Sequence, residues 1–228
     1  MQTPQTNPLL SLSPLDGRYK AKCEELSPFF SEYGLIFYRL RVEIEWLKTL
    51  CNCSKIVELS AFKSSDLQSL DSIIDKFSLK DAQRVKDIEK ITNHDVKAVE
   101  YFLKEKLEKK SDLKPLTEFI HFACTSEDIN NLAYALMIKD SRDKVLLPVM
   151  REILERISVL ARNYSEQPML SRTHGQPASP TTVGKEFANV AYRLKRQLNF
   201  IEGSNILGKM NGAVGNYNAH IIAYPEID

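Results

Sequence analysis

The chain has 228 residues, of which 31 are basic, 30 are acidic and 43% are hydrophobic, so its formal net charge is +1. This balance is typical of a globular protein, and it lacks the basic excess that nucleic-acid-binding domains usually carry. No apolar run approaches the ~20 residues that a membrane-spanning helix needs, and the first 13 residues do not have the pattern of a secretory signal. We therefore expect a cytoplasmic protein that binds neither nucleic acid nor membranes.

Apolar residues follow a helical spacing along most of the chain. Three stripes, in residues 30–51, 146–164 and 183–201, repeat every three or four positions, which predicts a long helix with one apolar face at each place. Such a face can be an interaction surface, but the buried core of a helical bundle is the favoured interpretation. Since no alternating strand pattern is evident, the sequence predicts an all-α fold.

A short break in the helical pattern lies at residues 111–115, where a charged helix end gives way to a proline. We therefore predict a smaller helical domain over residues 1–114 and the first part of a longer helical bundle over residues 115–228.

The four cysteines do not indicate a disulfide scaffold in a chain of this length. Cys51 and Cys53 form a C-x-C pair, but neither a second pair nor a nearby histidine completes a zinc site. We expect no metal site.

The first polar stretch, SPLDGRY at residues 13–19, contains an Asp-Gly pair that predicts a turn. The turn would place Arg18 and Tyr19 side by side, and an arginine suits bidentate binding of a phosphate or a carboxylate. A surface turn with an unengaged arginine is the alternative.

The second polar stretch, Asn93-His94-Asp95, interrupts a helical pattern. An acid beside a histidine could orient the imidazole or hold it in its charged form. Thr92 stands three residues before Asp95, as in a capping box, so a simple capping turn is an equally good interpretation.

The third polar stretch begins with Thr125 and Ser126 at a predicted helix start. Two hydroxyls at such a place could bind an oxyanion or a phosphate, because the free backbone N–H groups there favour anions. Thr125 also stands three residues before Asp128, and locally a helix cap is the favoured interpretation.

The fourth polar stretch, at residues 171–180, holds His174, Gly175 and two prolines between two predicted helices. A histidine titrates near neutral pH and suits proton transfer, although a lone loop histidine is more often structural. The other notable histidine, His121, lies among apolar residues, and we interpret it as packed and hydrogen-bonded.

Together these stretches resemble the adenylosuccinate lyases, which are members of the fumarase/aspartase superfamily. The matching segments are SPLDGRY at 13–19, TNHDVKAVEYF at 92–102, TSEDINN at 125–131, SRTHGQPASP at 171–180 and GKMNGAVGNYNAH at 208–220. The resemblance covers nearly all of the chain after about Leu12. It implies an L-aspartase/fumarase-like all-α fold, with a small helical N-terminal domain followed by part of a long-helix bundle.

The resemblance also implies a reaction, a β-elimination of fumarate from adenylosuccinate, giving AMP, and from SAICAR, giving AICAR, without a cofactor and in a homotetramer. His174 matches the family's general acid, which protonates the departing nitrogen, and Thr173 flanks it. His94 matches the histidine that binds and orients the substrate. The other residues that match substrate-binding positions are Arg18, Tyr19, Asn93, Asp95, Thr125 and Ser126.

The chain departs from the family by stopping roughly halfway along the family pattern. By resemblance, the part beyond it contains the serine loop that supplies the general base, so we expect the acid and part of the binding site without that base. One alternative is another lyase of the superfamily, such as an argininosuccinate lyase. The other is a non-catalytic helical interaction protein.

Overall fold

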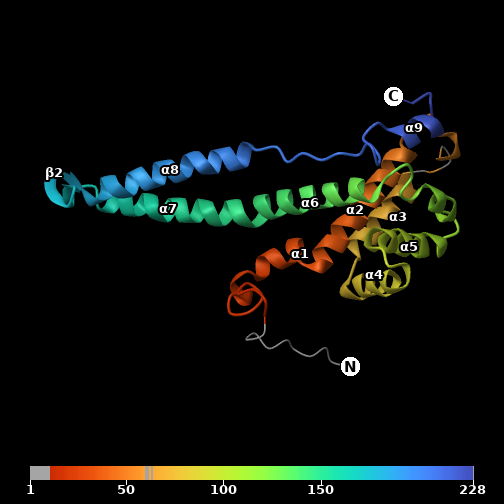
Figure 1. Cartoon of the computed structure of the whole chain (residues 1–228), viewed down its shortest axis with the longest axis horizontal. Coiled ribbons are helices and arrows are strands. Elements are labelled where there is room, and N and C mark those ends of the chain that lie inside the picture. Colours follow the sequence, from red (N-terminus) through yellow and green to blue (C-terminus); the bar gives the residue numbers. More distant parts are fainter. Residues whose placement is uncertain (1–10, 60–61, 63, 228) are drawn as a thin grey trace. The chain divides into compact units, whose positions relative to one another are not determined.

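The computed structural model describes residues 11–59, 62 and 64–227, and its helices and strands are labelled in Figure 1. These residues form two compact units. Unit 1 contains the described residues up to Ile138 together with those from Leu207 onward, and unit 2 is Lys139–Ile206. Unit 1 is therefore discontinuous in sequence. The domain boundary expected at residue 114 stays a prediction.

Helices make up most of the described chain, so the predicted all-α class is confirmed apart from one small hairpin. The α-helices are α1 (Ser27–Phe30), α2 (Glu32–Cys51), α3 (Ser64–Asp75), α4 (Leu79–Thr92), α5 (Asp95–Glu108), α6 (Ser126–Ser141), α7 (Leu147–Asn163), α8 (Val183–Gly203) and α9 (Asn218–Ala223). Short 3-10 helices cover Lys20–Lys22, Glu24–Leu26, Val57–Leu59 and Lys114–Phe119, and a π-helical turn, Arg142–Leu146, lies between α6 and α7. Among the helices of the described residues, none has both the length and the apolar composition to cross a membrane.

The first predicted stripe, at residues 30–51, is not one helix. Ser31 has an extended backbone and caps α2, because its hydroxyl oxygen accepts a hydrogen bond from the N–H of Gly34 at 3.1 Å. This cap separates α1 from α2, and Phe30 at the end of α1 is 51% exposed. The prediction of a single buried stripe from Phe30 onward is therefore wrong at its first residue.

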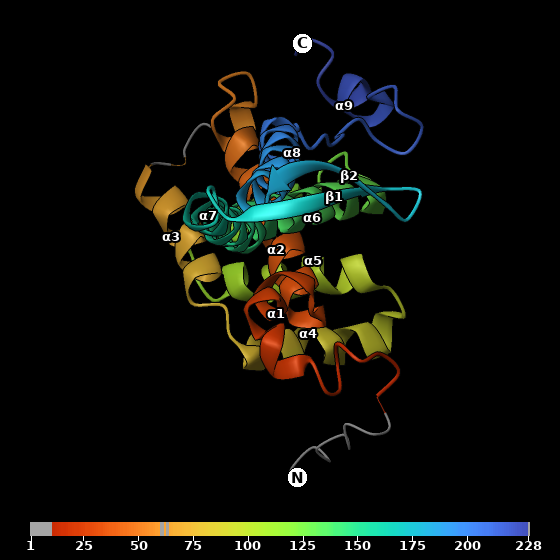
Figure 2. The same cartoon turned by 90° about the vertical axis from the view of Figure 1, so that its left-hand side faces the viewer.

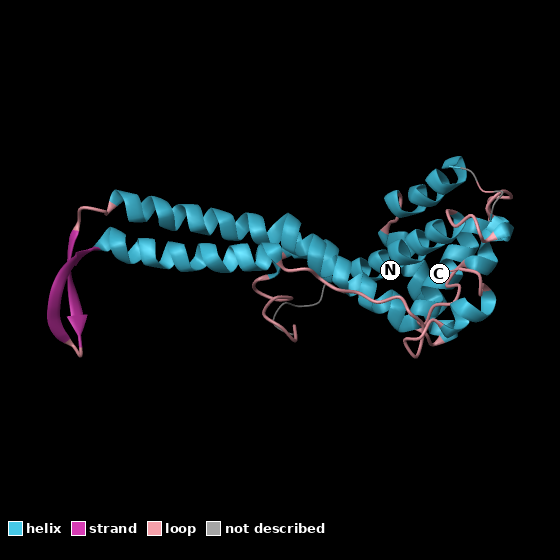
Figure 3. Ribbon diagram, turned by 90° about the horizontal axis from the view of Figure 1, so that it is seen from above, coloured by secondary structure: helices cyan, strands magenta, loops and turns pink. Residues whose placement is uncertain are grey.

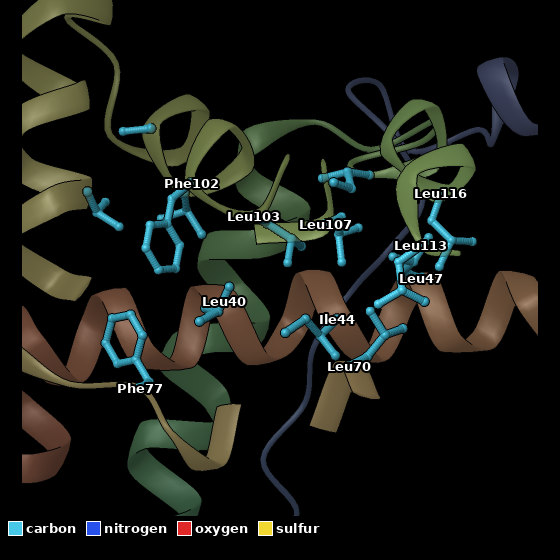
Figure 4. Close-up of a cluster of buried hydrophobic side chains, with 14 of the residues drawn as sticks. Leu40, Ile44, Leu47, Leu70, Phe77, Phe102, Leu103, Leu107, Leu113 and Leu116 are labelled. Atoms are coloured by element: carbon cyan, nitrogen blue, oxygen red, sulfur yellow. The ribbon is translucent and has the colours of Figure 1, made fainter. Parts of the chain in front are cut away.

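The core of unit 1 is built around α2. Leu40, Ile44 and Leu47 lie one turn apart on its buried face and belong to the same cluster of buried residues as Phe102 and Leu107 of α5. Figure 4 shows these side chains between α2 and the segments that cover it. The core therefore fixes α2 and α5 together, and the N-terminus of α5 carries the second polar stretch.

Unit 2 is a pair of long helices, α7 and α8, that pack side by side (Figure 3). Gly184 allows the close approach at one end, since a Cβ atom there would lie 2.3 Å from the carbonyl oxygen of Ala161. Much of the predicted apolar stripe is open to solvent: Val149 is 47% exposed and Val190 50%, whereas Leu198 is buried. The buried-core interpretation of these two stripes is thus wrong for much of their length within this chain.

A β-hairpin joins α7 to α8, where the sequence predicted a loop. Strands β1 (Pro168–Thr173) and β2 (Gln176–Thr182) pair antiparallel (Figure 2). Their register is irregular between Leu170 and Arg172. Both strands are edge strands and mostly exposed, so neither face demands alternating apolar residues, and prolines are tolerated at edges. This is why the strand pattern did not appear in the sequence.

Candidate functional site

The junction between α4 and α5 is made by Asn93. Its backbone is left-handed, with φ 50°, and its N–H donates to the carbonyl oxygen of Glu89 at 2.8 Å, which closes α4. Asparagine tolerates this conformation better than most residues. Thr92 is the last residue of α4 rather than a cap, so the predicted capping box with Asp95 is wrong.

His94 itself caps α5. Its Nδ1 atom accepts a hydrogen bond from the N–H of Lys97 at 3.2 Å. A neutral imidazole whose Nδ1 is an acceptor carries its proton on Nε2, so Nε2 is the donor toward the hydroxyl of Ser126, 3.4 Å away at the start of α6. The side chain is about half exposed. The cap uses only Nδ1 and leaves Nε2 for other contacts, and the role of His94 in substrate binding stays a prediction.

Asp95 is oriented by a residue that the sequence did not reveal. The Arg39 guanidinium is buried in unit 1, and its Nη2 lies 2.6 Å from Oδ2 of Asp95 while its Nε donates to Oδ1 of Asn130 at 2.9 Å. Burial alone would raise the pKa of Asp95, but the N–H of Val96 and the charge of Arg39 outweigh it and hold that pKa below its usual value. The one feature of the sequence that could have pointed to Arg39 is the position of this cation directly beside the apolar stripe of α2.

The start of α6 is held by Asp128. Its Oδ2 accepts from the N–H of Thr125 at 2.8 Å, so one half of the predicted Thr125–Asp128 capping box is present. Asp128 is fully buried, and its carboxylate also accepts from the N–H groups of Asn211 and Gly212 and pairs with Lys209 at 2.7 Å. Burial opposes the charge, but these donors outweigh it and lower the pKa of Asp128.

Asn131 strengthens the same connection. Its side chain donates to the carbonyl oxygen of Lys209 at 3.0 Å and accepts from the N–H of Lys209 at 2.7 Å. The segment TSEDINN is therefore largely an attachment site for the distant residues 209–212, while its first residues, Thr125 and Ser126, lie at the helix start.

A shallow surface pocket adjoins the α4–α5 junction, and its lining consists of Lys86, Glu89, Lys90, Asn93, His94 and Asp95. The structure thus brings together five of the predicted binding residues, namely Asn93, His94, Asp95, Ser126 and its neighbour Thr125. In the described chain, no group of three or more His, Cys, Asp or Glu side chains is arranged to hold a metal ion.

Arg18 and Tyr19 pair with each other in the turn before the first 3-10 helix. The guanidinium donates to the tyrosine hydroxyl at 2.5 Å, and its Cζ atom lies 4.5 Å from the ring centroid. The two side chains are thus side by side, as the sequence predicted. Neither makes a hydrogen bond to His94 within the described residues.

Thr173 and His174 belong to unit 2, at the tip of the hairpin. Thr173 pairs with Gln176, and the two residues between them, His174 and Gly175, have φ of 49° and 77°. Positive φ at both central residues is the signature of a type I′ turn, in which glycine is common and histidine is not. The imidazole is exposed at this tip.

A family model described as "Lyase" matches residues 17–227. The chain belongs to this lyase family. Two solved structures share its fold: a fumarate lyase from Mesorhizobium sp. BNC1 (TM-score 0.66, 20% identity, covering 87% of this chain and 44% of that one), and a 3-carboxy-cis,cis-muconate lactonizing enzyme from Pseudomonas putida (TM-score 0.67, 16% identity, 88% and 44%).

Curated relatives are more specific. The adenylosuccinate lyase of Haemophilus influenzae is 55% identical over 224 residues, which is 98% of this chain and 49% of the relative. The adenylosuccinate lyase of Escherichia coli K12 is 56% identical over 220 residues, or 96% and 48%. The chain therefore spans about half the length of the curated relatives that it matches.

Proposed function

We propose that this chain is part of an adenylosuccinate lyase and carries the general acid and a portion of the substrate site. The single observation that supports this most strongly is the 55–56% identity, along nearly the whole chain, to relatives that bear this one name. The neighbouring side chains of His94 and Ser126 in unit 1 are in keeping with it, because a purine nucleotide carrying a succinyl group presents a phosphate and two carboxylates to hydrogen-bond donors.

The proposed reaction is a β-elimination. A base removes a proton from the succinyl carbon, and the electron pair left behind forms the double bond of fumarate as the bond between carbon and nitrogen breaks. The departing nitrogen takes a proton from the imidazolium of His174. In this proposal the base comes from a serine loop outside this chain, and the same chemistry applies to adenylosuccinate and SAICAR without a cofactor.

The binding roles follow from the donors that the site offers. An oxyanion that displaces the 3.4 Å contact between Nε2 of His94 and the hydroxyl of Ser126 can accept from both groups, and Asn93 lies at the adjoining pocket. We assign Thr125, Thr173, Arg18 and Tyr19 to substrate binding as well. A cytoplasmic location is part of the same proposal.

The test uses this chain fused to the C-terminal half of the Escherichia coli relative, here named the completed chain. We expect it to release fumarate from adenylosuccinate and to lose that release in His174→Asn. Argininosuccinate is the comparison substrate. A folded completed chain that cleaves only argininosuccinate, or neither compound, would contradict the proposal.

We also propose that the full enzyme is a homotetramer assembled through α7 and α8. The support is the apolar surface that both helices leave open, including Val149, Ile153, Val190 and Phe200, since large exposed apolar faces mark association sites. Light scattering of the completed chain should give four times the mass of one chain. A compact monomer would contradict this assembly.

A further inference from the structure

We propose that Arg39 is a positioning residue of the candidate site: its guanidinium joins the start of α5 to the first turns of α6 and thereby holds His94 against Ser126. This inference deepens the proposed function, on which its meaning for substrate binding rests.

The first step is the closed ring of contacts. Ser126 and Asn130 are four residues apart on α6, so both side chains lie on one face of that helix, one turn apart. His94 lies 3.4 Å from Ser126, and Arg39 donates to Asn130 at 2.9 Å. The ring closes through Asp95, which contacts Arg39 at 2.6 Å and follows His94 in the chain.

The second step is the rigidity of the central group. Arg39 is 5% exposed and stands on α2, whose neighbouring residues Leu40 and Ile44 are fully buried in the core of unit 1. A buried guanidinium with two directed acceptors has little freedom to move, because each lost hydrogen bond would leave a desolvated charge unsatisfied. Arg39 therefore anchors this closed set of contacts to the core of unit 1.

The third step is the contrast in exposure. The side chains of His94 and Asp95 are 49% and 45% exposed, so packing does not fix them. Their orientation depends on hydrogen bonds, and on the Asp95 side the charged partner is Arg39. The hydrogen bond between His94 and Ser126, at 3.4 Å, is too long to hold the starts of α5 and α6 together by itself.

The proposal is tested on this chain with the variant Arg39→Met, which keeps the length and apolar packing of the side chain but removes both donors. The direct measurement is the NMR signal of the imidazole nitrogens, and the chain has only four histidines to assign. In the native chain we expect His94 to hold its proton on Nε2. In Arg39→Met we expect the Nε2 signal, whose proton faces Ser126, to shift, while the Nδ1 signal, which depends on the backbone N–H of Lys97, and the signals of His174 and His220 stay unchanged.

The matched control is Lys48→Met, which also removes a cation from α2, but one that pairs with Asp71 of α3 at 2.7 Å. It should leave the His94 signals in place. Arg39→Lys, which can keep the charge near Asp95 but not the second directed bond, should give an intermediate shift. If Arg39→Met does not fold, Asn130→Ala removes only the α6 side of the link, and the same His94 signals then decide. Unchanged His94 signals in a folded variant would overturn the proposal.

The consequence for binding is measured separately by calorimetry with AMP. The native chain should bind AMP, and Arg39→Met should bind it about tenfold or more weakly, because a small displacement of binding groups has a large effect. Absence of AMP binding by the native chain would count against the proposed function, whereas the NMR result would still decide the role of Arg39. Equal AMP affinity in both chains would overturn the positioning role.

Discussion

His121 and Glu43 face each other in the interior of unit 1, with Nδ1 of the histidine 2.6 Å from Oε1 of the carboxyl group. Glu43 is fully buried, and its other oxygen has no hydrogen-bond partner within the described chain. The interpretation of His121 as a packed, hydrogen-bonded histidine is confirmed. The pair stabilises the fold best when His121 is charged or Glu43 is protonated, because an ionised buried carboxylate that faces a neutral imidazole would be poorly compensated.

Stability of unit 1 should therefore fall as the pH rises. Burial raises the pKa of Glu43. Burial lowers the pKa of His121, but the hydrogen bond and charge of Glu43 outweigh this and raise it above 6.5. Since both groups bind protons more tightly in the folded state, the contribution of His121 is fully present below pH 6.5 and is lost as the pH rises through its folded pKa.

The measurement is urea unfolding at pH 6.5 and at about 8.5, a range that brackets the titration of a histidine with a raised pKa. The signal is the fluorescence of Trp46, the one tryptophan of the sequence. Glu43→Gln should cost about 1–3 kcal/mol at the lower pH, as expected for loss of a charged hydrogen bond, and should flatten the pH dependence. An unchanged pH dependence in this variant would show that other groups cause it.

Asp128→Asn should loosen residues 209–212. The asparagine keeps the size of the side chain but loses the charge that pairs with Lys209. Its NH2 group also replaces one carboxylate oxygen, so that a donor would face backbone N–H groups that now donate to Asp128. We expect a cost of about 2–4 kcal/mol, as for other broken buried polar networks, and faster hydrogen exchange at Gly212. Glu127→Gln, an exposed neighbour on the same helix, is the control and should change neither.

The two ends of α8 offer a matched pair of glycines. A Cβ atom at Gly184 would lie 2.3 Å from the carbonyl oxygen of Ala161 and 2.6 Å from backbone atoms of Ser165, whereas one at Gly203 would meet nothing within 4 Å. Gly184→Ala should therefore destabilise unit 2 by about 1–3 kcal/mol, while Gly203→Ala should be neutral or stabilising by up to about 1 kcal/mol. Thermal unfolding followed by circular dichroism measures both. Equal midpoints would contradict the close approach of α7 and α8.

His174→Asn separates the shape of the hairpin from its proposed chemistry. Asparagine followed by glycine is the preferred pair for a type I′ turn, so the pairing of Thr173 with Gln176 should persist and be visible as a cross-strand nuclear Overhauser effect. In the completed chain the same variant should lower fumarate release about 100- to 10,000-fold, the usual share of a general acid. Loss of the hairpin itself would instead assign the histidine a structural role.

Much of unit 1 could be predicted from the sequence because local signals and packing agree there. The apolar spacing of α2 and α5 reflects the faces that they bury, and the polar runs at residues 93–95 and 125–126 do lie at helix starts. The roles of Arg39 and Asp128 could not be predicted, because their partners are 56 to 91 residues away for Arg39 and as many as 84 for Asp128. Spacing rules describe only neighbours along the chain.

Unit 2 was predicted less well, for a different physical reason. Its apolar stripes are helical, as expected, but helical spacing does not say whether the face is covered by the same chain, and Val149 and Val190 remain open. The hairpin has two exposed strands with prolines, so the period of two that reveals a half-buried strand is missing.

The discontinuity of unit 1 bears on how the chain acquires its structure during synthesis. Asp128 accepts a hydrogen bond from the N–H of Gly212, which lies 84 residues farther along the chain. At the ~5–20 residues per second of translation, these residues follow Asp128 from the ribosome by roughly 4 to 17 s. Meanwhile α7, the hairpin and α8, which need only neighbouring contacts, can form first. A nascent chain is therefore expected to hold the carboxylate of Asp128 without its partners at residues 211 and 212 during this interval.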